Sequence, residues 1–379
     1  ALERDGHYGH LWTGGSHRRD HQRCPRGGKI NCGIHNTGCT ISYLKEEMSL
    51  TKSILEGNRL ALARLLTQVE KDLPEGHSTL AELFPYTGKA HLIGVTGAPG
   101  TGKSSLVNQL ALQYRKTIEK KVAIIAVDPS SPFTGGAVLG DRVRMRDLSG
   151  DEGVFIRSMA SRGSLGGVAQ KTASIVQVFD AAGYEIIIIE TVGAGQSEVD
   201  VARLAHTTVV VEAPGLGDEI QAIKAGILEI ADVLVINKAD RPGVENTERA
   251  LRSTLKLGHP VQRVFRHHGK TMAVDAPTMD PHFWIPPIVK TVATEGKGLK
   301  ELVEAIAKHA AHLDQSGDRA ARDRARLQSE METLLQETLM NRFLEHISQE
   351  QYSELLEKVF NRNISPPEAV KFLLNGNPK

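Results

Sequence analysis

The chain has 379 residues, which is long enough for one large α/β domain with appendages or for two domains. Its 40% hydrophobic and 24% charged residues are typical of a globular protein, and a net charge of +1 gives no electrostatic case for nucleic acid or an anionic membrane as partner. No apolar run approaches the roughly 20 residues that cross a bilayer, and no secretory signal is recognisable. We therefore expect a cytoplasmic protein with no membrane partner.

Residues 1–47 differ in composition from the rest of the chain. They are rich in Gly, Arg and His and lack apolar periodicity, which predicts no packed structure. All three cysteines, Cys24, Cys32 and Cys39, lie there, and their spacings do not match the usual zinc-ligand pairs. Metal capture and an organellar transit peptide are alternatives. We favour a third interpretation, in which Met48 is the true start and the preceding residues are a mis-annotated upstream segment.

From Met48 the pattern becomes helical. Apolar residues from Ile54 to Val69 form one broad face, which predicts a helix, and Leu80 to Phe84 predict a second short helix before Pro85. These residues make up an expected N-terminal helical extension over 48–88.

Residues 89–315 alternate between continuous apolar runs and helical patterns. Strands are expected at 92–95, 122–127, 154–159, 186–189, 208–211, 233–236 and 288–292, and helices at 103–116, 167–182, 218–229, 244–256 and 298–312. The alternation predicts an α/β fold with a mostly parallel sheet and helices on both faces. Ligands then belong at the carboxyl ends of the strands. The segment 259–287 fits no element and is interpreted as a loop or insertion.

The last part of the chain, 316–379, reads as a helical arm. Leucines and other apolar residues between Leu327 and Ile347 predict a long amphipathic helix, followed by a shorter helix around 355–360 and a last one starting at Pro366. Folding back onto the core is one interpretation of this arm. We favour the pairing of two subunits, so a homodimer is expected.

The stretch that carries the strongest motif is Leu92–Gln109, LIGVTGAPGTGKSSLVNQ. It places the pattern G-x-x-x-x-G-K-[ST] between a buried strand and a helix, which predicts a phosphate-binding loop in a P-loop NTPase. Backbone N–H groups and the helix N-terminus favour phosphate, Lys103 can reach the outer phosphates, and the Ser104 hydroxyl can bind Mg²⁺. The expected nucleotide contacts in this loop are Gly97, Ala98, Pro99, Gly100, Thr101, Gly102, Lys103, Ser104 and Ser105.

A second motif indicates which nucleotide binds. Asn237, Lys238 and Asp240 form N-K-x-D at the end of a buried strand. A carboxylate can accept two hydrogen bonds from the N1–H and amino groups of guanine, whereas adenine offers no such pair of donors. The motif predicts GTP and GDP as ligands. Thr291, Val292 and Ala293, after the last expected strand, are candidates for a second contact to the purine.

The strand 186–189 ends in an acid followed by glycine, Glu190-Thr191-Val192-Gly193. A P-loop NTPase needs a carboxylate that orders Mg²⁺ and a γ-phosphate sensor at such a position. We assign Glu190 to the metal and water shell and Gly193 to the γ-phosphate. Asp128, at the tip of the strand 122–127, is a second metal candidate, and capping a turn is its alternative role.

The glycine-rich loop over 133–145 has the charges of a switch. Asp141, Arg142 and Arg144 could meet phosphate or metal when the loop closes, or could be solvated surface charges. An arginine from a partner can raise phosphoryl-transfer rates by about 10³–10⁵. No such arginine can be named from this sequence, and we expect slow turnover by the isolated protein.

Several strings together resemble one family, the methylmalonyl-CoA mutase-associated GTPases, which are also described as kinases of the lysine/arginine/ornithine transport system. They are GAPGTGKSSL, VDPSSPFTGGAVLGDRVRM, RGSLGG, ETVGAGQSEVD, PGLGDEIQAIKAGILEIAD and NKAD. The resemblance covers roughly 50–350, with Ala194 in place of the family's usual Val and a longer 259–287 segment.

The resemblance implies a dimeric G protein that binds an adenosylcobalamin-dependent mutase, gates cofactor loading and protects the enzyme. By the same resemblance, Lys103, Asp128, Asp141 and Glu190 are catalytic, with Ser104, Asp128 and Glu190 as magnesium ligands. A partner-responsive switch is implied at Asp218, Glu219, Gln221 and Lys224, whose acids could instead simply favour a helix N-terminus. Two other functions remain open: a P-loop kinase of a transport system, against which N-K-x-D argues, and a nickel-insertion GTPase, supported only by the N-terminal His and Cys residues.

Overall fold

The computed structural model describes residues 49–129, 146–148, 150–161, 167–191, 202–215, 230–258, 264–267, 270–273 and 284–375. All of these residues belong to one compact unit, Met48–Lys379. Within these segments, no helix combines the length and the apolar character needed to cross a membrane.

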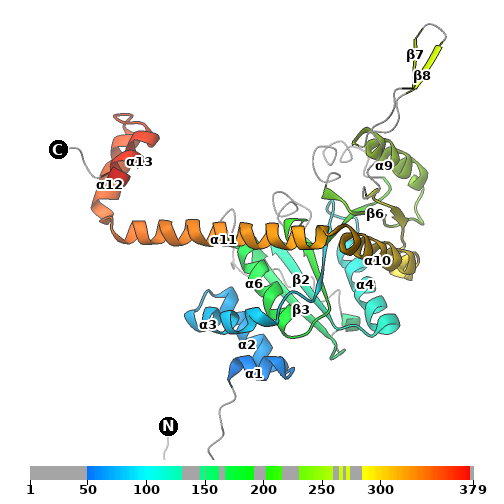
Figure 1. Cartoon of the computed structure of the whole chain (residues 1–379), viewed down its shortest axis with the longest axis horizontal. Coiled ribbons are helices and arrows are strands. Elements are labelled where there is room, and N and C mark those ends of the chain that lie inside the picture. Colours follow the sequence, from blue (N-terminus) through cyan, green and yellow to red (C-terminus); the bar gives the residue numbers. More distant parts are fainter. Residues whose placement is uncertain are drawn as a thin grey trace, which may run out of the picture. The chain divides into compact units, whose positions relative to one another are not determined.

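The centre of this unit is a seven-stranded parallel sheet (Figure 1). Its strands, in spatial order, are β3 (Val154–Ser161), β2 (Val122–Pro129), β4 (Ile186–Thr191), β1 (His91–Thr96), β5 (Thr207–Glu212), β6 (Val233–Ile236) and β9 (Ile288–Lys290). Each neighbouring pair is parallel. The α/β fold with a mostly parallel sheet, expected from the alternating pattern, is confirmed.

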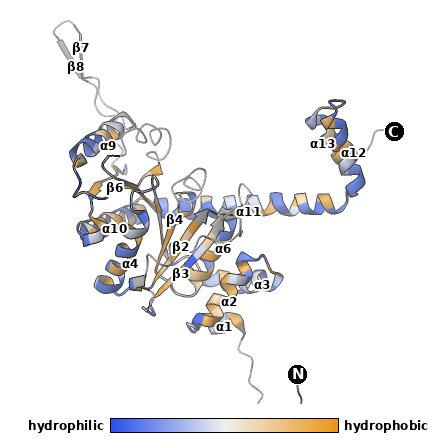
Figure 2. Cartoon of the chain, turned by 180° about the vertical axis from the view of Figure 1, so that it is seen from behind, coloured by the Kyte–Doolittle hydropathy of each residue, from blue (hydrophilic) through white to orange (hydrophobic). Residues whose placement is uncertain are grey.

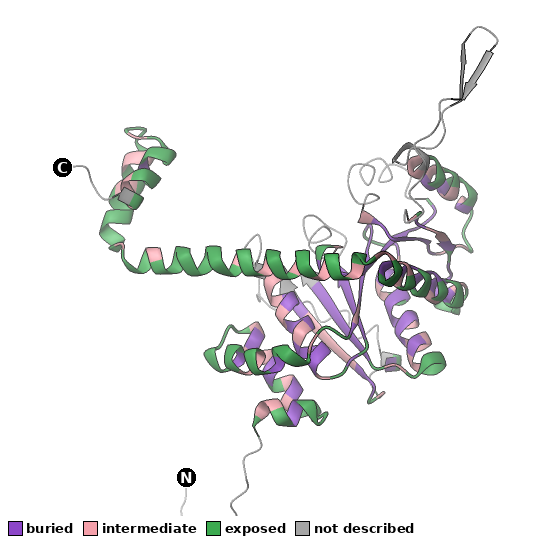
Figure 3. Cartoon of the chain, viewed as in Figure 1, coloured by how far each residue is buried: buried purple, intermediate pink, exposed green. Residues whose placement is uncertain are grey.

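Alternate residues of the strands pack against different helices. In β1, Ile93 and Val95 join the core formed with α4 (Lys103–Ile118) and α10 (Leu299–Ser316), while Leu92 joins the core formed with α2 (Arg59–Glu70) and α6 (Gly167–Ala181). Because side chains alternate across a strand, a sheet with both faces buried needs nearly continuous apolar strands. Figure 3 shows the central strands of the sheet buried, whereas the edge strands β3 and β9 also contain residues that are not fully buried. A third cluster packs α9 (Val244–Gly258) against β5 and β6.

The N-terminal helices differ from the expectation. The apolar face from Ile54 to Val69 belongs to two helices, α1 (Leu50–Leu55) and α2, because Gly57 adopts a φ of 86° and Asn58 caps α2 by accepting hydrogen bonds from the next turn. Leu60, expected on the buried face, is 83% exposed. The expected short second helix is α3 (Pro74–Leu83), ten residues long with Pro74 at its start.

Parts of the 259–287 segment form strands, so its interpretation as a loop is wrong for those parts. The strands β7 (Val264–His267) and β8 (Lys270–Ala273) form an antiparallel pair of their own. The expected strand 288–292 ends earlier, at Lys290, because the next residues leave the sheet and Val292 makes an isolated bridge with Lys297. The helix expected at 218–229 lies outside the described residues.

The C-terminal arm begins after Gly317, which has a φ of 80° and ends α10. It consists of α11 (Asp318–Glu345), α12 (Gln349–Phe360) and α13 (Pro366–Asn375). No residue of α11 is buried, and Figure 2 shows hydrophobic and hydrophilic residues mixed along it. Its first half is tied to α6, because Gln177 Nε2 donates to Glu330 Oε1 at 2.9 Å.

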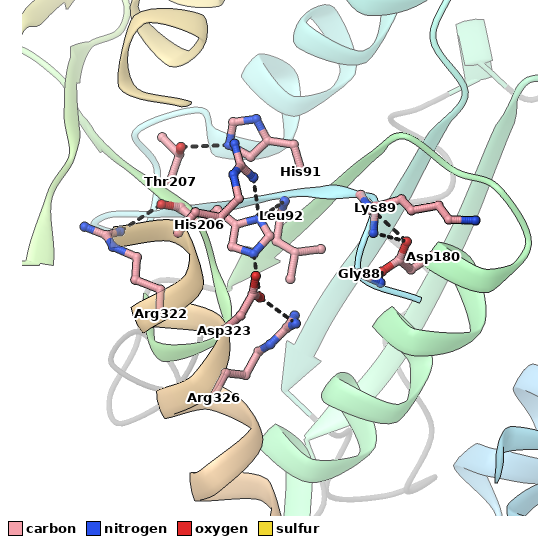
Figure 4. A network of polar contacts seen from close by, with 12 residues as sticks. Gly88, Lys89, His91, Leu92, Asp180, His206, Thr207, Arg322, Asp323 and Arg326 are labelled. Carbon is pink, nitrogen blue, oxygen red and sulfur yellow. Dashed lines mark hydrogen bonds and ion pairs between the residues drawn. The ribbon is translucent and has the colours of Figure 1, made fainter. Parts of the chain in front are cut away.

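A polar network lies at the amino ends of β1 and β5 (Figure 4). His91 Nε2 is 2.8 Å from Thr207 Oγ1, which is 2.9 Å from His309 Nδ1 in α10. Burial, together with the nearby His206 and Arg319, lowers the pKa of His91 from 6.5 to about 3. His91 is therefore neutral in the folded protein near pH 7.

This shifted pKa predicts a loss of stability in acid. The folded protein binds a proton at His91 less tightly than the unfolded chain does. His91 therefore does not lower the free energy of unfolding above about pH 6.5. Below that pH its contribution lowers the free energy of unfolding by up to about 1.4 kcal/mol per pH unit, down to about pH 3. The variant His91→Gln should lack this component, whereas His77→Gln, at an exposed histidine, should keep it. Urea unfolding at several pH values measures both. Parallel stability curves for wild type and His91→Gln would contradict the prediction.

Candidate nucleotide site

The predicted phosphate-binding loop connects β1 to α4, which starts at Lys103. Gly97 has a φ of 137° and lies so close to β5 that a Cβ atom there would be 2.1 Å from the Val211 carbonyl oxygen. Gly102 has a φ of 91°, and its Cβ would lie 2.5 Å from Asn237 Nδ2. Both positions therefore require glycine, as the motif predicts.

The Lys103 side chain lies within this loop. It is 6% exposed, and its ammonium group donates to the carbonyl oxygens of Gly97 at 2.8 Å and Ala98 at 3.0 Å. The buried Thr101 hydroxyl also donates to the Ala98 carbonyl, at 2.9 Å. These bonds hold the cation at the loop, where phosphate oxygens of a nucleotide would be within reach of Lys103. Pro99, Gly100 and Ser105 are exposed at the rim.

Ser104 and Glu190 come together although they are far apart in the sequence. The Ser104 hydroxyl donates to Glu190 Oε1 at 2.6 Å, because β1 and β4 are neighbours with Val95 opposite Glu190. The residues just beyond, Thr96 and Thr191, also join their buried hydroxyl groups at 3.0 Å. A hydroxyl and a carboxylate oxygen side by side are the kind of ligands that Mg²⁺ prefers. The two residues thus fit a magnesium site.

Asn237 joins the loop to the segment after β9. Its side chain is 2% exposed, and Nδ2 donates to the Thr101 carbonyl oxygen at 2.9 Å. Its Oδ1 accepts hydrogen bonds from the Thr291 hydroxyl and the Ala293 N–H, both at 3.1 Å. These bonds of the amide fix one strand end to its neighbours, and the predicted contact of Asn237 with the nucleotide stays a prediction.

The residues that follow Asn237, from Lys238 to Asp240, are held by further hydrogen bonds. Lys238 has a φ of 56°, and its ammonium group donates to the carbonyl oxygen of Gly100. The Ala239 N–H donates to the Thr291 carbonyl oxygen at 3.0 Å, and Asp240, the next residue, is exposed. Val292 is 8% exposed and lies in the same segment. Asp240 thus lies exposed two residues after Lys238, whose side chain contacts the phosphate-binding loop, and its contact with a purine base stays a prediction.

Some residues of this edge were missed by the sequence analysis. Thr96 and Thr191 were not singled out, although each is a polar residue that ends an apolar strand. Glu212, which ends β5 in the same way, is 1% exposed, and its carbonyl oxygen accepts the Asn237 N–H at 2.8 Å. A polar residue at the last position of a continuously apolar strand is the signal that could have found all three.

Other predicted residues are less fully described. Asp128 lies near the end of β2, opposite Ala160 of β3, and only its backbone is described. Asp141, Arg142, Arg144, Gly193, Asp218, Glu219, Gln221 and Lys224 lie outside the described residues, as does the whole of 1–47 with its cysteines. The assigned roles of all these residues stay predictions.

A phosphate-binding loop after β1, a hydroxyl–carboxylate pair and an N-K-x-D motif, placed along one edge of a parallel sheet, define a P-loop GTPase that binds guanine nucleotides. Residues 62–348 match the family described as Methylmalonyl Co-A mutase-associated GTPase MeaB. The chain belongs to this family.

Individual relatives agree with this assignment. A putative GTPase of Pyrococcus abyssi is 42% identical over 86% of this chain and 95% of its own. The GTPase ArgK of Escherichia coli is 35% identical over 86% of this chain and 96% of its own. Among solved structures, a LAO/AO transport system kinase superposes with a TM-score of 0.62 at 27% identity, covering 86% of this chain and 95% of that one. The family expected from the sequence motifs is confirmed.

Proposed function

We propose that this GTPase is a magnesium-dependent switch that acts in the cytoplasm on an adenosylcobalamin-dependent acyl-CoA mutase, gating cofactor loading and protecting the mutase. The observation that carries the proposal is the match to a mutase-associated GTPase family over residues 62–348. Methylmalonyl-CoA mutase or a related acyl-CoA mutase is the proposed partner.

The described residues support separate roles in GTP binding and hydrolysis. The backbone of the loop and the N-terminus of α4 hold the phosphates, Lys103 neutralises charge on the transferring phosphoryl group, and Asp240 recognises guanine. Ser104 and Glu190 would hold Mg²⁺, with Asp128 as a further candidate, and the ion would supply charge neutralisation between the outer phosphates. Asp141 and Gly193 complete the proposed site.

The rival assignment is a kinase of a transport system. Its support is the structural likeness to a solved protein that is named a LAO/AO transport system kinase. The N-K-x-D motif favours guanine and thus the GTPase switch. Hydrogen bonds of Asn237 to Thr101 and Thr291 hold this motif at the phosphate-binding loop. The nickel-insertion alternative depends on His and Cys residues within 1–47, and deleting residues 1–47 without loss of function would remove it.

We further propose that two copies of the chain pair through the arm. The exposed apolar residues Leu327, Met331, Leu335 and Leu339 of α11 follow one another at intervals of four and so lie along one side of the helix. A second copy would bury this stripe and remove it from water. Analytical ultracentrifugation should detect a dimer for the wild type and a monomer for the double variant Leu335→Glu/Leu339→Glu. A monomeric wild type at micromolar concentration would reject the pairing.

The partner proposal is tested by binding and by rates. The GTPase rate should be slow alone and rise when a cobalamin-dependent acyl-CoA mutase is added, by up to about 10³–10⁵-fold if the partner supplies an arginine. A pull-down with the same mutase measures binding, and Ser104→Ala, which removes a proposed metal ligand, serves as the inactive control. Rapid turnover without partner, or neither binding nor stimulation by any mutase encoded nearby, would count against the role.

A further inference from the structure

Two buried threonines connect the carboxyl ends of β1 and β4. Thr96 is the last residue of β1 and is 0% exposed, and Thr191 is the last residue of β4 and is 1% exposed. The Thr191 hydroxyl donates to the Thr96 hydroxyl oxygen at 3.0 Å, and we call this bonded pair the threonine link. Valine would fill the same space without hydroxyl groups to desolvate, so packing alone does not account for the pair.

The threonine link lies directly beside the proposed magnesium site. The last pair in the register of β1 and β4 is Val95 with Glu190, and the link joins the residue after each of them. Thr96 is followed by Gly97, where the phosphate-binding loop begins. The link therefore connects the start of this loop to the strand end that carries the proposed metal ligand Glu190.

Hydrogen bonds on both faces of the sheet hold these strand ends together. Because side chains alternate along a strand, Glu190 and Thr191 point to opposite faces. Glu190 lies on the face of α4, where the Ser104 hydroxyl donates to its Oε1 at 2.6 Å. Thr191 lies on the face of Ile189, which packs in the core formed with α6. The carboxylate is thus held from one face, and the backbone that carries it is held from the other.

The separation of the two strand ends sets the geometry available to the metal. Mg²⁺ requires nearly octahedral ligands at about 2.0–2.1 Å, so small displacements of a ligand weaken its binding. Ser104 lies in the first turn of α4, which follows the loop after β1, whereas Glu190 belongs to β4. A shift between β1 and β4 would therefore move one ligand relative to the other. The threonine link, one residue beyond Glu190, restricts such a shift.

We propose that Thr96 and Thr191 are positioning residues of the magnesium site, whose hydroxyl bond holds Glu190 at the separation from Ser104 that Mg²⁺ requires. This inference rests on the proposed assignment of Ser104 and Glu190 to the metal. The threonines act through the backbone of β1 and β4 and do not touch the ion. Groups that orient metal ligands in this way change metal affinity or activity by about 10–100-fold when they are removed. Loss of the link should therefore raise the Mg²⁺ concentration that the protein needs.

Two double variants of the full chain separate positioning from packing. Thr96→Val/Thr191→Val removes both hydroxyl groups and keeps the shape of both side chains, and replacing both partners of a hydrogen bond in this way leaves stability nearly unchanged. Thr96→Ser/Thr191→Ser keeps both hydroxyl groups. The matched control is Thr247→Val, which removes the hydroxyl group of a buried threonine in α9. Thermal unfolding shows whether each variant is folded.

The Mg²⁺ requirement is measured by binding and by rate. Release of a fluorescent GDP analogue, which needs no catalysis, and single-turnover GTP hydrolysis are both followed over a series of Mg²⁺ concentrations. The valine double variant should need about tenfold more Mg²⁺ than the wild type for half of the full effect in each measurement. The serine double variant and Thr247→Val should match the wild type. With the metal removed by EDTA, all four proteins should release the analogue at the same rate.

The variant Glu190→Gln distinguishes failure of the link from failure of the metal site. If Glu190→Gln keeps the wild-type Mg²⁺ requirement, the magnesium assignment and the positioning role are both wrong. If Glu190→Gln raises the requirement but the valine double variant does not, only the positioning role is overturned. Faster release from the valine double variant in EDTA would also overturn it, because the damage would then lie in the loop.

If the valine double variant does not fold, the single variants decide the question. Thr96→Val and Thr191→Val each remove the same hydrogen bond, so both should raise the Mg²⁺ requirement by a similar factor. A wild-type requirement in either single variant would reject the positioning role.

Discussion

Replacing Lys103 by alanine should lower the rate of GTP hydrolysis by about 10²–10³-fold, which is the usual effect of removing one preorganised group that stabilises transition-state charge. The ammonium group is held at the loop by the carbonyl oxygens of Gly97 and Ala98, so its position is set before the nucleotide binds. Single-turnover assays at saturating GTP separate this loss from weaker binding.

The matched control for this substitution is Lys116→Ala. Lys116 lies on the same helix, α4, but is exposed near its C-terminal end. This variant should hydrolyse GTP at the wild-type rate, and thermal unfolding should show that both variants are folded. A Lys103→Ala protein that retains most of its hydrolysis rate would show that the lysine is not part of the catalytic site.

Replacing Asp240 by asparagine should change the base that is preferred. The carboxylate of Asp240 is expected to accept two hydrogen bonds from guanine, and loss of two charge-assisted bonds at about 1.5–3 kcal/mol each corresponds to about 10²–10⁴-fold weaker GTP binding. Xanthine has a carbonyl where guanine has its amino group, so the asparagine amide can donate to it. Binding of GTP and XTP, measured by titration calorimetry, should therefore move in opposite directions.

The control for the base pocket is Glu245→Gln, which removes a nearby exposed acid in the first turn of α9. Its nucleotide preference should stay that of the wild type. If Asp240→Asn still prefers GTP to XTP, the assignment of the base pocket to Asp240 is wrong, and the segment 291–293 would have to be tested by substitution instead.

Local patterns predicted the sheet well because parallel strands with both faces buried are continuous apolar runs. β6 begins and ends where expected, and β1 is one residue longer at each end. The helices of the N-terminal extension were predicted less well, because an apolar face can continue across the break between two helices and so does not reveal it. Gly57 and the cap at Asn58 divide it, and Leu60 is exposed for that reason.

The sequence by itself determined the phosphate-binding loop, the guanine motif and the family, because these depend on residue types at fixed local spacing. Only the tertiary structure decided which distant residues meet. The bond between Ser104 and Glu190 requires β1 and β4 to be neighbours, and Asn237 reaches Thr101 because β5 and β6 continue the same sheet. The attachment of α11 to the sheet is likewise invisible in the sequence, since His206, Leu92 and Asp323 are brought together by strand order and by the path of α11. Parallel pairing sets strand ends side by side without regard to sequence distance, and for that reason the contacts between motifs had to come from the fold.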